Sequence, residues 1–120
     1  MLLLDKIFHI RSMEVNENKA SVIGVLNADN VIFSAHFPGH PVLPGVCQIR
    51  IVTEVLEVML DRKLSLTEAR NLKYINIITP ASSPLDIFFS KIDKTDNAIN
   101  CTVTIKSGEE VCTKMSLRYE

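Results

Sequence analysis

The stretch that decides the fold reads Ala35-His36-Phe37-Pro38-Gly39-His40-Pro41-Val42-Leu43-Pro44-Gly45. Its three prolines and two glycines favour an irregular, rigid loop, because proline fixes φ and glycine allows turns and close backbone approaches. The loop leads directly into a helical pattern, with Pro44 near the first turn, where its missing N–H costs nothing. We therefore expect His36 beside a helix N-terminus, whose unpaired N–H groups favour a negatively charged oxygen.

From Gly45 onward, apolar residues recur at steps of three and four residues, as on one face of a helix. The series consists of Val46, Ile49, Val52, Leu56 and Met59. A polar stripe is expected beside it, made of Arg50, Glu54, Glu57 and Asp61. Further apolar residues widen the apolar arc, so we predict a mostly enclosed central helix over residues 44–62.

The rest of the chain has the alternation and turn residues of β-strands. We expect strands over residues 6–15 and 20–26 before the helix, and over 70–78, 85–93, 98–106 and 110–119 after it. Residues 63–68 are expected to form a connecting segment. One long helix with two strands before it and an antiparallel series after it predicts the α+β class.

Length and composition indicate a single globular domain over residues 1–120. Apolar residues make up 47% of the chain and charged residues 22%, which is ordinary for such a domain. The net charge of −1 is dispersed along the chain, so neither a nucleic-acid nor a membrane partner is expected. No apolar run reaches the length of a membrane span.

The start of the chain and the spacing of its cysteines and histidines predict a cellular compartment and the absence of a metal site. Asp5 and Lys6 interrupt the apolar start of the chain, so we expect no signal peptide and a cytoplasmic protein. The three cysteines, Cys47, Cys101 and Cys112, are widely spaced, which is typical of reduced thiols. No Cys or His spacing indicates a zinc site.

Two stretches resemble a known family. Residues 36–46, read as His-Phe-Pro-Gly-x-Pro-x-x-Pro-Gly-Val, resemble the signature of the 3-hydroxyacyl-acyl-carrier-protein dehydratases of fatty-acid synthesis. Residues 71–76, Asn-Leu-Lys-Tyr-Ile-Asn, with Pro80 beyond, are similar to that family's Asn-Val-Lys-Phe-Leu-Lys-Pro strand, although Ile77 stands where the family usually has proline. The resemblance implies a hotdog fold, with an antiparallel sheet around the central helix. It also implies a homodimer whose sheets join, or a higher oligomer of such dimers.

The resemblance also implies a site. His36 would remove the α-proton of a 3-hydroxyacyl thioester carried by acyl carrier protein or coenzyme A, and the Gly45 amide would stabilise the negative charge that develops on the carbonyl oxygen. Substrate would contact Phe37, Gly45, Val46, Cys47 and Arg50. Neither a metal nor another cofactor is expected.

Arg50 departs from the family pattern, because the family has a catalytic carboxylate fourteen residues after the histidine. Arginine cannot act as a general acid, because its guanidinium holds its protons throughout the neutral range. It could form an ion pair with Glu54 or bind an anion through its guanidinium. Glu54 could replace the acid, but it lies one turn further on, about 6 Å along the axis.

Three functional interpretations therefore remain open: a dehydratase-like enzyme, an acyl-binding or heterodimer subunit that lacks the acid, and, with least support, a hotdog thioesterase. In the second case, a carboxylate-bearing paralogue would complete one of the two sites. Three other side chains are expected to have no catalytic role: His40 is expected to be exposed, His9 structural and Cys47 a buried, inert thiol.

Overall fold

The computed structural model describes residues 6–35, 39 and 41–120. The first half holds strands β1 (Phe8–Asn16) and β2 (Lys19–Leu26), a single helical turn α1 (Ile32–Ala35) and the central helix α2 (Gly45–Leu60). The second half holds β3 (Leu66–Tyr74), a short 3-10 helix η1 (Pro80–Ser82), β4 (Leu85–Lys94), β5 (Ile99–Ser107) and β6 (Glu110–Tyr119).

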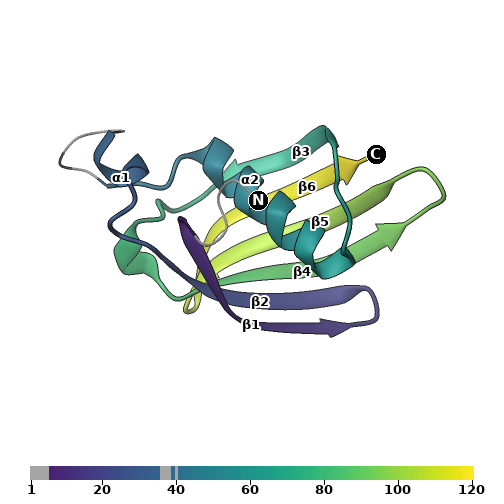
Figure 1. Cartoon of the computed structure of the whole chain (residues 1–120), viewed down its shortest axis with the longest axis horizontal. Helices are drawn as coiled ribbons and strands as arrows, with labels where there is room; N and C mark the ends of the chain where they lie inside the picture. The colour runs from purple at the N-terminus through teal and green to yellow at the C-terminus, as the bar shows by residue number, and fades with distance from the viewer. Residues whose placement is uncertain (1–5, 36–38, 40) are drawn as a thin grey trace.

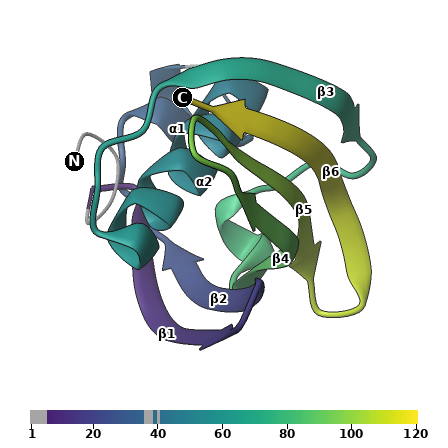
Figure 2. The same ribbon diagram turned by 90° about the vertical axis from the view of Figure 1, so that its right-hand side faces the viewer.

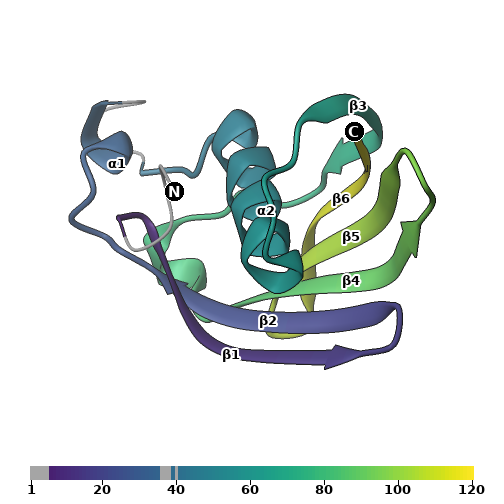
Figure 3. The same cartoon turned by 45° about the vertical axis from the view of Figure 1, so that its right-hand side comes forward.

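The strands form a six-stranded sheet in the order β1-β2-β4-β5-β6-β3, in which all neighbours are antiparallel. After β2 the chain leaves the sheet, forms α2 and returns at the opposite edge as β3 (Figure 1). The sheet curls around α2, which lies in its hollow (Figures 2 and 3). This is the α+β hotdog architecture that the resemblance implies.

The core lies between α2 and the concave face of the sheet. Alternate residues of the four central strands are buried there, as the period of two requires. On the helix, Val52, Val55 and Leu56 are fully buried against them. The sheet side of this core includes Val22, Ile87, Phe89, Val103, Met115 and Leu117.

The predicted central helix is confirmed within two residues at each end. It ends at Asp61, whose left-handed φ of 53° turns the chain and whose N–H donates to the Glu57 carbonyl. The polar stripe, in contrast, was predicted wrongly at one position. Glu54 is 0% exposed, because neighbouring elements cover this side of α2 as well.

The boundaries predicted for the strand after the helix were also wrong. β3 begins at Leu66, within the expected connecting segment, and ends at Tyr74 rather than at residue 78. It is an edge strand with all nine residues exposed, so its side chains show no burial alternation to read. Beyond it the chain turns away from the sheet, and the N–H groups of Ile75 and Asn76 both donate to the Cys112 carbonyl at 2.7 and 3.0 Å.

Candidate active site

Within the described part of the chain, the N-terminus of α2 presents backbone donors that have no partner. Pro44 is the residue before the helix and, having no suitable side chain, makes no side-chain cap. Its carbonyl accepts from the N–H groups of Cys47 and Gln48 at 3.0 and 3.1 Å. The N–H groups of Gly45 and Val46 find no acceptor among the described residues. They concentrate the positive end of the helix dipole at this point.

A cavity of about 310 Å³ opens beside these donors. One wall is the loop and first turn of α2, and the other is the segment that follows β3. The Leu43 N–H ties the two walls together by donating to the Ile78 carbonyl at 2.7 Å. The lining residues are Val42, Leu43, Pro44, Gly45 and Gln48 on one side and Tyr74, Ile75, Asn76, Ile77 and Ile78 on the other.

The cavity is bordered by exposed apolar side chains. Ile75 is 52% exposed, Ile77 is 70% exposed, and nearby on the helix Val46 is 76% exposed. Large apolar side chains gathered at one place on a surface mark a site for an apolar ligand or a partner. The arrangement can hold an acyl chain with a polar carbonyl directed at the helix N-terminus.

Tyr74 explains why residue 45 is glycine. A β-carbon at Gly45 would collide with the Tyr74 hydroxyl and would lie 2.5 Å from the ring carbon Cζ. Gly45 has ordinary helical geometry, so its role is to allow this close approach rather than an unusual turn. The end of the Tyr74 side chain therefore lies against the first residue of α2.

A buried hydrogen-bond network holds the helix N-terminus on the sheet. Thr113 of β6 donates its hydroxyl to Gln48 Oε1 at 2.6 Å, and Gln48 Nε2 donates to the Leu43 carbonyl at 3.2 Å. Gln48 is 4% exposed and Thr113 is 0% exposed. Because buried polar groups are costly when unpaired, this network fixes the loop relative to β6.

Arg50 does not line the cavity. Its Nε donates to Glu54 Oε2 at 2.9 Å, and its side chain is 41% exposed, whereas the Glu54 side chain is fully buried. The expected i,i+4 ion pair is thus present. In it a carboxylate oxygen serves as an acceptor, whereas a general acid would have to present a proton.

The other predicted site residues separate into two groups. His36 and Phe37, together with His40, lie outside the described residues. Val46 and Cys47 are in the first turn of α2 but do not line the cavity. Burial raises the pKa of the Cys47 thiol, which disfavours the reactive thiolate.

Two residues at this end of the molecule were not predicted as part of it. Tyr74 was visible only as a member of the second motif, and Thr113 gave no signal, because its contact depends on the pairing of β6 with its neighbours. Among the described residues, no three His, Cys, Asp or Glu side chains are grouped so that they could hold a metal ion. Within the same part of the chain, no helix is long and apolar enough to cross a membrane.

The fold and this cavity define a hotdog domain with an open site at the N-terminus of its central helix. Solved structures agree on the fold. The chain superposes on a chain of "The Dehydratase Heterocomplex ApeI:P from Xenorhabdus doucetiae" with a TM-score of 0.70 and 19% identity, covering 93% of this chain and 96% of that one. It superposes on AziG of S. sahachiroi with a TM-score of 0.65 and 12% identity, covering 93% and 88%.

Sequence comparison then gives the family. The ApeI-like family, described as ApeI dehydratase, matches residues 12–115, and the chain belongs to it. The 3-hydroxyacyl-[acyl-carrier-protein] dehydratase FabZ of Novosphingobium aromaticivorans is 30% identical over 81 residues, or 68% of this chain and 49% of that protein. The FabZ of Rickettsia bellii is 27% identical over 92 residues, or 68% and 59%. The chain thus spans about half the length of the curated relatives it matches.

Proposed function

We propose that the chain acts on 3-hydroxyacyl thioesters, carried by acyl carrier protein or coenzyme A, at the N-terminus of α2. The observation that carries this proposal is the pair of N–H groups at Gly45 and Val46, which have no acceptor among the described residues and lie beside an apolar cavity. Removal of the α-proton places negative charge on the thioester carbonyl oxygen, and donors fixed at that oxygen lower the barrier. His36 is the proposed base.

The family's carboxylate, which would supply the acid of the reaction, is replaced in this chain by Arg50. Arg50 is engaged in an ion pair with Glu54, and its guanidinium serves there as a hydrogen-bond donor. This observation favours a second candidate, in which the chain forms a heterodimer with a carboxylate-bearing paralogue and contributes His36 and the oxyanion donors. One of the solved relatives is itself a dehydratase heterocomplex.

We further propose that β3 is the dimer interface, whether the second subunit is identical or a paralogue. All nine of its residues are exposed, and one edge of its backbone is unpaired within the part of the chain that the structure describes. Exposed edge strands of this length invite pairing with another strand. The apolar side chains Leu66 and Leu72 would be partly covered by it.

The decisive experiment restores a carboxylate at position 50. Arg50→Glu alone is a poor test, because it places two carboxylates one turn apart and removes the Arg50 nitrogen from the buried Glu54. Removal of the Arg50 guanidinium takes away part of what compensates the buried Glu54 charge, so it is expected to lower stability. The double variant Arg50→Glu/Glu54→Gln keeps an acceptor and a donor at position 54 without the second charge.

Wild type, the double variant and Glu54→Gln are incubated with 3-hydroxyacyl thioesters, and formation of the conjugated enoyl product is followed by absorbance. The double variant should dehydrate about 10²-fold faster than the wild-type homodimer, which is the usual contribution of a positioned acid. Light scattering on the same samples should give the mass of two chains.

The outcomes separate the candidates. An active double variant with a slow wild type supports the incomplete site, and mixing wild type with a carboxylate-bearing paralogue should then restore the rate. Release of free acid and thiol would show a thioesterase instead. A folded double variant that binds substrate but stays inert would contradict His36 as the base.

A further inference from the structure

We propose that the Tyr74 hydroxyl is a second hydrogen-bond donor to the thioester carbonyl oxygen, beside the Gly45 N–H. This inference rests on the proposed function and adds a catalytic residue to it. Tyr74 would contact the substrate from the end of β3, across the cavity from the loop that precedes α2.

The hydroxyl lies against the first residue of the helix. It lies so close to Gly45 that a β-carbon added there would force the Tyr74 side chain to move. Tyr74 and Gly45 both line the same cavity. A carbonyl oxygen that reaches the Gly45 N–H from this cavity would therefore lie near the phenol oxygen.

The hydroxyl is available to a ligand. No hydrogen bond within the described part of the chain involves it, and Tyr74 is 49% exposed. The other tyrosine of the chain behaves differently, because the Tyr119 hydroxyl is 2.9 Å from Thr53 Oγ1 in the core and the residue is 0% exposed. The Tyr119 hydroxyl thus forms a hydrogen bond in the core, whereas the Tyr74 side chain lines the cavity.

The protonation state of Tyr74 suits a donor. Burial of part of the side chain raises its pKa above the ordinary value for tyrosine. The hydroxyl therefore keeps its proton throughout the neutral range and can donate.

The reaction needs no proton from Tyr74. The base takes the α-proton, the C–O bond to the β-hydroxyl breaks, and that oxygen leaves as water with a proton from the acid of the complete site. Between these events the carbonyl oxygen gains negative charge and then loses it as the double bond forms. Tyr74 donates a hydrogen bond to that oxygen while the charge is present, which lowers the barrier.

The test is Tyr74→Phe, which removes the hydroxyl and keeps the ring over Gly45. Phenylalanine is also the residue of the family motif that this segment resembles. The matched control is Tyr119→Phe, which removes the other tyrosine hydroxyl from the core. Each is made in the wild-type chain and in the Arg50→Glu/Glu54→Gln background, and kcat and KM are measured for dehydration.

We expect Tyr74→Phe to lower kcat by about 10² with little change in KM, as for the loss of one oxyanion donor. Tyr119→Phe should lower the melting temperature and leave kcat unchanged. A second readout does not depend on turnover. The carbonyl stretching frequency of a bound ¹³C-labelled thioester should be lowered by wild type and less so by Tyr74→Phe.

These measurements distinguish a failure of the proposed function from a failure of the role proposed for Tyr74. If the wild-type and double-variant proteins neither bind nor dehydrate the thioester, the proposed function fails and the inference fails with it. If they dehydrate it and Tyr74→Phe retains both kcat and the carbonyl shift, only the role of Tyr74 is overturned. A faster Tyr74→Phe would mean that the hydroxyl obstructs the site, which also overturns it.

Discussion

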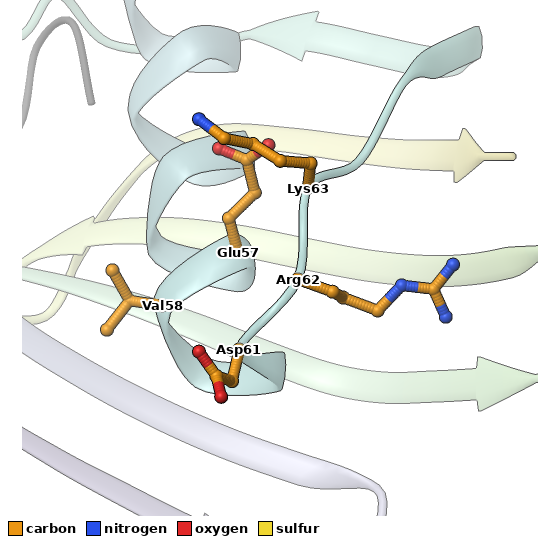
Figure 4. Close-up of a pocket in the computed structure, with 5 residues that line it drawn as sticks. All are labelled: Glu57, Val58, Asp61, Arg62 and Lys63. Carbon is orange, nitrogen blue, oxygen red and sulfur yellow. The ribbon is translucent and has the colours of Figure 1, made fainter.

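The two ends of α2 each open onto a cavity, and the two cavities are nearly equal in volume, about 310 Å³ at the N-terminus and about 320 Å³ at the C-terminus. The C-terminal cavity is lined by Glu57, Val58, Asp61, Arg62 and Lys63 (Figure 4). Four of these five side chains are charged. The N-terminal cavity, in contrast, is lined mostly by apolar side chains and backbone.

The two ends differ most in how their backbone groups are paired. At the C-terminus, the Glu57 carbonyl accepts from the N–H groups of Asp61 and Arg62, and Glu57 Oε2 accepts from the Leu64 N–H at 2.9 Å. At the N-terminus, the first two N–H groups have no acceptor in the described chain.

Cavity volume therefore does not identify the site. In Figure 4 the Arg62 side chain extends away from Glu57, so the charged groups of the C-terminal cavity do not converge on one point. What distinguishes the N-terminal end is a set of donors, without acceptors among the described residues, beside an apolar wall. Such a difference can be tested by changing one residue at each end.

The largest effect is expected for Gly45→Ala. The added β-carbon collides with the Tyr74 hydroxyl, so the ring must move off the helix N-terminus. We expect kcat for dehydration to fall by about 10² or more. The free energy of unfolding should change by no more than about 1 kcal/mol, because alanine favours the helix and the half-exposed ring can swing outward.

Val58→Ala at the other cavity is the matched control for Gly45→Ala, and it should leave kcat unchanged. Steady-state rates and thermal unfolding are measured on both variants. A Gly45→Ala protein with the wild-type rate would show that the contact between Tyr74 and the helix is not part of the site.

The sequence predicts the central helix better than the edge of the sheet, for a physical reason. The helix begins after a proline and keeps a helical apolar period over 16 residues, and both signals are local. β3 is exposed on both faces, so it has neither an alternating pattern nor an apolar run. Its position depends on pairing with β6, which is a long-range contact.

The same distinction applies to the site. Gly45 and its neighbours are predicted from one continuous motif. Tyr74 reaches Gly45 only because β3 crosses to the sheet edge beside the helix N-terminus. The burial of Glu54 depends on what covers α2, and the sequence places it on a polar stripe. A single sequence does not show which residues of the site are brought together by tertiary packing.

A smaller effect, on stability, is expected for Thr113→Val at the N-terminal end. The substitution keeps the shape of the side chain and leaves Gln48 Oε1 without its donor in the core. We expect the free energy of unfolding to fall by about 1–3 kcal/mol in urea denaturation. Thr102→Val, on the exposed face of β5, is the control and should stay within about 0.5 kcal/mol of wild type. Equal stability of the two variants would mean that the network does not fix the loop.

The smallest effect is expected at the C-terminal end, for Glu57→Ala. The substitution removes the acceptor of the Leu64 N–H, but water can reach this partly exposed turn and alanine favours the helix. We expect a loss of about 0.5–1 kcal/mol in the free energy of unfolding and no change in kcat. Glu57→Gln retains an acceptor oxygen and should recover most of the stability. A large fall in kcat for Glu57→Ala, restored by Glu57→Gln, would place the C-terminal cavity in the reaction. The contrast between the two ends of the helix would then be lost.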